Sequence, residues 1–154
     1  MPKIEEKLKK MGLTLPDAPT PMATYVPTVR TGNLVFMSGV VPRGADGKLL
    51  VGKLGATMTV EQGYAAAKGC ALALLANLKK EIGDLDKVVR IVKVLGLVNS
   101  APDFTQPPAV VNGCSDLLVE LYGDTGRHAR SAVGVAALPA GVPVEVEMVV
   151  EVRG

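Results

Sequence analysis

The residues best suited to chemistry lie near the C-terminus, where an arginine precedes two closely spaced glutamates. Arg130 begins a run of small and apolar residues, and Glu145 and Glu147 alternate with valines further along. A guanidinium can hold a carboxylate with two parallel hydrogen bonds, and a carboxyl group can act as a general acid or base. A solvated sheet face with ordinary salt bridges would explain the same residue types. The alternate positions after Arg130 hold Ala and Gly rather than long side chains, which leaves room beside the guanidinium. This favours the interpretation as a pocket for a small carboxylate.

Two strands and the turn between them are expected to position these side chains. The turn is the Pro-Ala-Gly-Val segment 139–142, which would join its flanking strands in a hairpin. If it pairs Leu138 with Pro143, Arg130 and Glu145 lie on one face of the sheet, and the valines of both strands lie on the other face, against helices. A slip of one residue would reverse this arrangement, so the shared face depends on that register.

The rest of the chain predicts an α+β order. Thr59 and Gln62 can form a capping box, and a glycine follows each expected helix. Strands, helix, strand, helix and hairpin together predict one sheet with both long helices on one face. The expected helices run from Ile4 to Met11, from Val60 to Ile82 and from Pro107 to Leu121, and the expected strands cover residues 25–30, 34–38, 88–98, 131–138 and 144–152.

Composition narrows the class of protein. A chain of 154 residues with 48% hydrophobic content fits one globular domain, and a net charge of +2 with 3% aromatic residues argues against a nucleic-acid surface. No run of eighteen apolar residues and no apolar N-terminal stretch is present, so we expect a cytoplasmic protein that does not cross a membrane. Cys70 and Cys114 are expected as buried free thiols rather than a disulfide, and a single histidine without a cysteine cluster argues against a metal site.

Several segments carry a family resemblance. Residues 130–139, Arg-Ser-Ala-Val-Gly-Val-Ala-Ala-Leu-Pro, and the Val-Glu-Val-Glu of residues 144–147 closely resemble the C-terminal signature of the RidA/YjgF family. Residues 34–42 resemble its apolar strand that ends in Ser-Gly with a nearby Pro. Residues 111–113 resemble its Val-Asn helix start, and residues 76–79 resemble the Asn-apolar-Lys of its long helix. The matches stand in the family's order.

The resemblance implies a fold, an assembly and an activity. Residues 25–154 would form a chorismate-mutase-like α+β domain with a single mixed sheet, and residues 1–24 an N-terminal helix and extended arm. The family assembles as a homotrimer with pockets between subunits. Its active members hydrolyse enamine or imine intermediates of the 2-aminoacrylate type to 2-keto acids and ammonia, with no cofactor and no metal. The implied partners are a small carboxylate substrate and further copies of this chain, with no nucleic acid and no membrane.

The resemblance also assigns roles to residues. Arg130 would bind the substrate carboxylate, and Glu145 would position or activate the hydrolytic water, from its own or a neighbouring subunit. Tyr25 would be a second catalytic residue. The alternative is that Tyr25 is a strand residue whose ring only packs on a neighbour. The remaining pocket residues implied by the family are Ser38, Gly39 and Asn112.

Three further positions could alter this pocket. Ala132 replaces a cysteine of the family and Gly134 replaces a glutamate, which indicates a divergent branch with a changed substrate. His128, the single histidine, could act as a general acid or base at the pocket mouth. A loop histidine that only forms hydrogen bonds is the alternative reading of that residue.

Two other functions remain open at this point. A divergent member could be a trimer that binds small carboxylates without turnover. An RNA-cleaving translation inhibitor is an activity attached to the family's names. The near-neutral charge and scarce aromatic residues disfavour the RNA-cleaving function, because strand binding uses basic grooves and stacking platforms.

Overall fold

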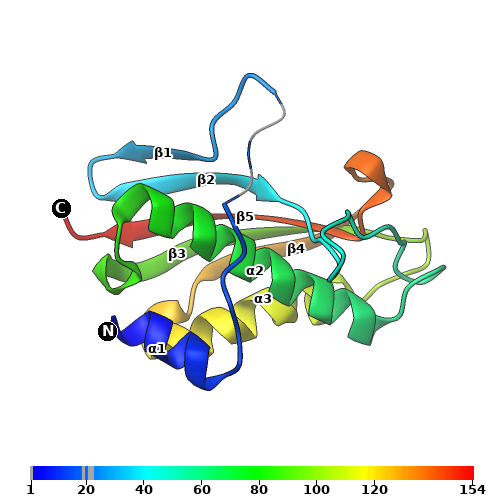
Figure 1. Ribbon diagram of the computed structural model, residues 1–154. Coiled ribbons are helices and arrows are strands. Elements are labelled where there is room, and N and C mark those ends of the chain that lie inside the picture. The colour runs from blue at the N-terminus through cyan, green and yellow to red at the C-terminus, as the bar shows by residue number, and fades with distance from the viewer. Residues whose placement is uncertain (1, 19, 21–22) are drawn as a thin grey trace.

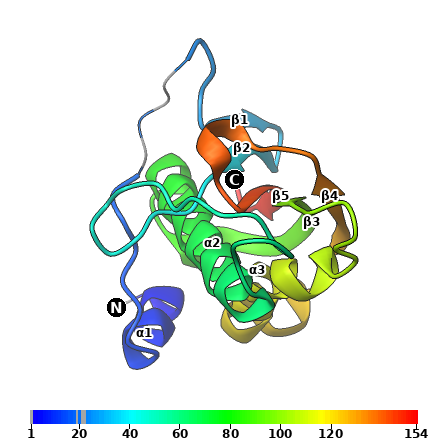
Figure 2. The ribbon, with the colours of Figure 1, turned by 90° about the vertical axis from the view of Figure 1, so that its right-hand side faces the viewer.

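One five-stranded sheet carries two long helices on a single face (Figures 1 and 2). The computed structural model describes residues 2–18, 20 and 23–154. The helices are α1 (Lys3–Lys10), α2 (Val60–Ile82) and α3 (Pro107–Tyr122), with short 3-10 turns η1 (Leu85–Lys87), η2 (Gly123–Gly126) and η3 (Pro139–Gly141). The strands are β1 (Thr28–Thr31), β2 (Leu34–Val40), β3 (Val88–Asn99), β4 (Ala129–Val135) and β5 (Val144–Val152). The predicted α+β layering is confirmed.

The long helices begin and end where local chemistry indicates. The Thr59 hydroxyl accepts from the Gln62 amide, and the Gln62 side chain accepts from the Thr59 amide, so both halves of the predicted capping box form. Gly83 follows α2 with a φ of 84°, a conformation that glycine adopts without strain. Pro107 opens α3, where its missing N–H costs nothing.

The predicted C-terminal hairpin is wrong. The strand order is β1-β2-β5-β3-β4, so β3 lies between β4 and β5, and β4 pairs with β3 in parallel. All other neighbouring pairs are antiparallel, which makes the sheet mixed. The segment after β4 crosses the end of β3 instead of turning back. At this crossing the backbone N–H of Asn99 donates to the Pro143 carbonyl at 2.9 Å. A short turn therefore joins two strands that are not neighbours.

Because β3 lies between β4 and β5, Arg130 and Glu145 are not on the same face of the sheet. Arg130 is in register with Val94, whose other neighbour is Met148, so Arg130 lies on the helix-covered face. Glu145 is in register with Leu97 on the opposite, open face. The prediction that Arg130 and Glu145 share one face is thus wrong. The expected turn would have placed Arg130 opposite Glu151, but β3 aligns Arg130 with Met148, and a shift by an odd number of residues, here three, exchanges the two faces.

The core lies between this sheet and the two long helices. Val144, Val146, Met148, Val150 and Val152 of β5 all point into it and are buried.

Cys70 and Cys114 are buried free thiols, as predicted. Burial raises the pKa of Cys114 to about 12 and that of Cys70 well above its usual value.

Helix α1 packs beside α3 and η1, where Asp86 accepts from the amides of Lys3 and Ile4. No helix in the described part of the chain is long and apolar enough to cross a membrane.

Candidate functional site

Arg130 lies on β4 at the edge of the sheet, and its side chain is held by α3. Its Nη1 donates to Asn112 Oδ1 at 2.8 Å and to Ser115 Oγ at 3.2 Å, which uses both Nη1 hydrogens. Among the described residues, neither Nε nor Nη2 of Arg130 has a hydrogen-bond partner, and no carboxylate forms an ion pair with it. The Nε–Nη2 edge is left for a ligand, and such an edge binds a carboxylate with two parallel bonds.

His128 extends this arrangement by one more side chain. Its Nδ1 lies 2.7 Å from the Gly126 carbonyl oxygen, and its Nε2 lies 2.8 Å from Ser115 Oγ. A carbonyl can only accept, so Nδ1 carries the hydrogen and the Nε2 of a neutral ring accepts from the Ser115 hydroxyl. Partial burial lowers the pKa of His128, and the charge of Arg130 lowers it further, against a raising effect of the Gly126 hydrogen bond. The ring is accordingly neutral at pH 7.

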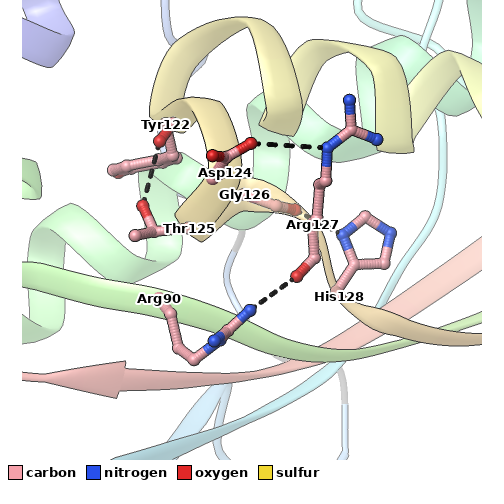
Figure 3. A network of polar contacts seen from close by, with 7 residues as sticks. All are labelled: Arg90, Tyr122, Asp124, Thr125, Gly126, Arg127 and His128. Carbon is pink, nitrogen blue, oxygen red and sulfur yellow. Dashed lines mark hydrogen bonds and ion pairs between the residues drawn. The ribbon is translucent and has the colours of Figure 1, made fainter.

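The turn that presents His128 is fixed by its own hydrogen bonds (Figure 3). Thr125 Oγ1 donates to the Tyr122 carbonyl at 2.9 Å, which closes η2. Arg90 Nη2, from β3, donates to the Arg127 carbonyl at 2.9 Å. The backbone on the N-terminal side of His128 is therefore tied to both a helix end and the sheet.

A cavity of about 220 Å³ opens beside these groups. Two arginines and one aspartate supply its formal charges, and Tyr64 already donates to that aspartate, Asp116, at 2.7 Å. A cavity of this size with a net positive charge suits a small organic anion. The residues that line it are Ser115, Asp116, Val119, Arg127, His128 and Arg130.

Glu145 forms a second cluster on the open face of the sheet. A Cβ placed on Gly39 would lie only 2.8 Å from Glu145 Oε2, so the carboxylate rests directly against that glycine. Partial burial raises the pKa of Glu145, and the like charge of Glu147 raises it further. Ser38 Oγ donates to the Val26 carbonyl at 2.6 Å and so ties the segment before β1 to this cluster.

Tyr25 belongs to that segment and not to a strand. It precedes β1, which begins at Thr28 rather than at residue 25 as predicted, and the residue is 51% exposed. In the single chain it is open to solvent.

Ala132 and Gly134 lie on the helix-covered face, in line with Arg130. Ala132 packs against the core, and a Cβ on Gly134 would lie 3.0 Å from Ser100 Oγ. These contacts favour small residues at both positions.

The structure thus brings Arg130, Asn112 and His128 together, and holds Glu145, Gly39 and Ser38 elsewhere. Ser115, which links Arg130 to His128, is absent from the predicted site. Its signal was available, because Asn112 and Ser115 are three residues apart and share one face of a helix.

Comparison with known proteins assigns the family. Residues 5–151 match the family model described as "YjgF/chorismate_mutase-like, putative endoribonuclease". The chain belongs to the RidA/YjgF family. It is 44% identical to Protein TCP17 of Trypanosoma cruzi over 152 residues, which cover 98% of this chain and 95% of that protein.

Two further relatives extend this assignment. The crystal structure of Atu1372, a protein of unknown function from Agrobacterium tumefaciens, superimposes with a TM-score of 0.90 at 41% identity, covering 97% of this chain and 92% of that one. The 2-iminobutanoate/2-iminopropanoate deaminase of Dermatophagoides farinae is 28% identical over 142 residues, which cover 92% of this chain and 95% of that enzyme. The family therefore includes an imine deaminase.

Proposed function

We propose that this protein hydrolyses reactive enamine or imine intermediates that carry a carboxylate, releasing ammonia and a 2-keto acid. The observation that carries the proposal is the state of Arg130, whose guanidinium is held by Asn112 and Ser115 while its Nε–Nη2 edge has no acidic partner among the described residues. An arginine fixed in this way and left uncompensated is suited to an anionic ligand. The deaminase relative supports the choice of reaction.

The proposed site lies between subunits of a homotrimer. Within one chain Arg130 and Glu145 lie on opposite faces of the sheet, so a site that contains both must take Glu145 from another copy. The open face also suits burial in an assembly, because Val29, Phe36 and Val133 are each about half exposed there. A closed ring of three copies would give three equivalent sites.

The chemistry needs few groups. The enamine tautomerises to an imine, water adds to the imine carbon, and the carbon–nitrogen bond breaks to give the keto group and ammonia. Arg130 would hold the carboxylate and orient that carbon. Glu145, with its raised pKa, would take a proton from the attacking water and return one to the leaving nitrogen. Such acid–base catalysis contributes roughly 10²–10⁴-fold in rate.

The experiment that tests the function measures ammonia release from 2-aminoacrylate generated enzymatically in the assay. Arg130→Ala should abolish release above the uncatalysed rate, whereas Arg30→Ala, at an exposed arginine of β1, should not change it. Full activity in Arg130→Ala would refute the proposed anchor. Absence of turnover in the unmodified protein, with a small carboxylate still raising the Tm, would instead indicate a carboxylate-binding protein without catalysis.

A subunit-mixing experiment tests the shared site. Arg130→Ala and Glu145→Gln are each expected to be inactive, but a mixed oligomer contains interfaces where an intact Arg130 meets an intact Glu145. Random assembly of equal amounts restores about a quarter of the sites in a ring in which each site joins two neighbours. If mixing after unfolding and refolding restores nothing, the site is not divided between subunits.

A further inference from the structure

The side chains around Arg130 form an unbroken series of hydrogen bonds that ends on the backbone. Arg130 Nη1 donates to Ser115 Oγ at 3.2 Å, the Ser115 hydroxyl donates to His128 Nε2 at 2.8 Å, and His128 Nδ1 donates to the Gly126 carbonyl at 2.7 Å. Every donor meets an acceptor only when the imidazole is neutral. In the deamination described above, Ser115 serves only to hold Arg130, and His128 has no role.

We propose that Ser115 and His128 are positioning residues that couple carboxylate binding at Arg130 to the uptake of a proton by His128. The inference rests on Arg130 as the carboxylate anchor of the proposed function, and it holds for any small carboxylate, whether or not it is turned over. His128 lines the same cavity as Arg130, and the Ser115 hydroxyl connects the two side chains.

The coupling follows from two cations that would share one hydroxyl. When His128 is protonated, both Nε2 and Arg130 Nη1 donate to Ser115 Oγ, and the hydroxyl hydrogen must turn to another acceptor. The free protein resists this state because an imidazolium and a guanidinium then lie on either side of one oxygen atom. A carboxylate bound to the Nε–Nη2 edge neutralises Arg130 and removes that repulsion. Because binding equilibria are reciprocal, protonation of His128 must strengthen carboxylate binding by the same factor.

Other charged groups face His128, but they do not change the direction in which a bound carboxylate shifts its pKa. From α3, Asp116 lines the same cavity and accepts from Tyr64, and this favours the protonated ring both with and without ligand. Arg127 opposes it from the same cavity and pairs with the fully exposed Asp124 at 3.7 Å. From β3, Arg90 binds the Arg127 carbonyl, and Lys93 is in register with Ala129. Of these groups, Arg130 is the one linked to His128 through a shared hydroxyl.

The chain has one histidine, so its imidazole signals in an NMR spectrum need no assignment. The experiment follows the His128 ring shifts from pH 4.5 to 8.5 in the full-length protein, without ligand and with saturating pyruvate, which stays ionised throughout. We expect pyruvate to raise the pKa of His128 by about half to one pH unit, equivalent to roughly three- to tenfold tighter pyruvate binding below this pKa than above it. Saturation is verified separately from the Asn112 side-chain amide signals.

Four variants test the links between the ligand, Arg130, Ser115 and His128. Arg130→Gln should abolish the effect of pyruvate on the His128 titration. Ser115→Ala should reduce it, and Ser115→Thr, which keeps the hydroxyl, should restore it. His128→Gln should leave pyruvate affinity nearly independent of pH when it is combined with Glu145→Gln, which removes the other titrating group of the proposed site.

Two outcomes would overturn the inference in distinguishable ways. Pyruvate that saturates the Asn112 signals but leaves the pKa of His128 unchanged refutes the coupling and leaves the Arg130 anchor standing. Pyruvate that does not bind at any pH refutes the anchor and the coupling together.

Discussion

A methyl group added at Gly39 should displace the Glu145 carboxylate without disturbing the fold. In Gly39→Ala the new Cβ would lie 2.8 Å from Glu145 Oε2 and 3.0 Å from both Cδ and Cγ. Ordinary contacts begin near 3.4 Å, so the carboxylate must move by about half an ångström or more. All three of these atoms belong to one flexible side chain on the open face of the sheet, so the strain can be relieved by moving that side chain alone.

The expected consequence is a loss of rate rather than of stability. Misplacing a reacting group by about 1 Å can cost roughly 10²-fold in rate, so a shift of half that size should lower kcat for ammonia release by about tenfold. The unfolding free energy should change by less than about 1 kcal/mol, because no buried backbone or core atom has to move. The assay compares kcat and the urea midpoint of the variant with those of the unmodified protein.

Gly69→Ala is the matched control for this prediction. Gly69 lies inside α2, and a Cβ there would meet no atom within 4 Å. Alanine at that position should stabilise the helix by about 0.5–1 kcal/mol and leave the rate unchanged. If Gly39→Ala keeps full activity, the position of the Glu145 carboxylate does not matter to the reaction, and the role given to Glu145 is wrong.

Three other predictions concern stability. Because burial raises the pKa of Glu145 in the folded chain, ionisation of this group lowers stability as pH rises through that pKa. Glu145→Gln should therefore raise the Tm at pH 7 while activity is lost, and the gain in Tm should vanish near pH 4. A Cβ at Gly113 would collide with the Tyr64 backbone carbonyl, so Gly113→Ala should cost about 3 kcal/mol or prevent folding, measured by urea unfolding. Asp86→Ala removes the acceptor for the first amides of α1 and should cost about 1 kcal/mol, with faster hydrogen exchange confined to that helix.

Helix positions could be predicted from sequence because their signals are local. The Thr59–Gln62 capping box, the proline at the start of α3 and the glycines after each long helix all act within a few residues, and each is found where expected. The hairpin prediction failed because strand adjacency is a property of the whole chain. A short turn with Gly and Pro favours a reversal, yet it cannot show that β3, encoded some forty residues earlier, occupies the place between the two strands.

The candidate site could be predicted in part for the same reason. Arg130 and Asn112 do meet, at 2.8 Å, although eighteen residues separate them. Ser115 was missed although its spacing from Asn112 places both on one helix face, because its role becomes evident only when the Arg130 and His128 side chains reach it from the sheet edge. The relation of Arg130 to Glu145 depended on one register that sequence alone could not fix.

The corrected register changes what each part of the site depends on. Arg130 and its partners lie between α3 and β4 of one chain, so the proposed carboxylate anchor is complete before any assembly. Glu145 lies on a face that a single chain leaves open, the same face that carries exposed Val133 and Phe36. If the site forms as proposed, recognition of the carboxylate is a property of the protomer and hydrolysis is a property of the oligomer. Dilution that separates the subunits would then abolish turnover while a protomer still binds the carboxylate, a pattern that a site built within one chain cannot produce.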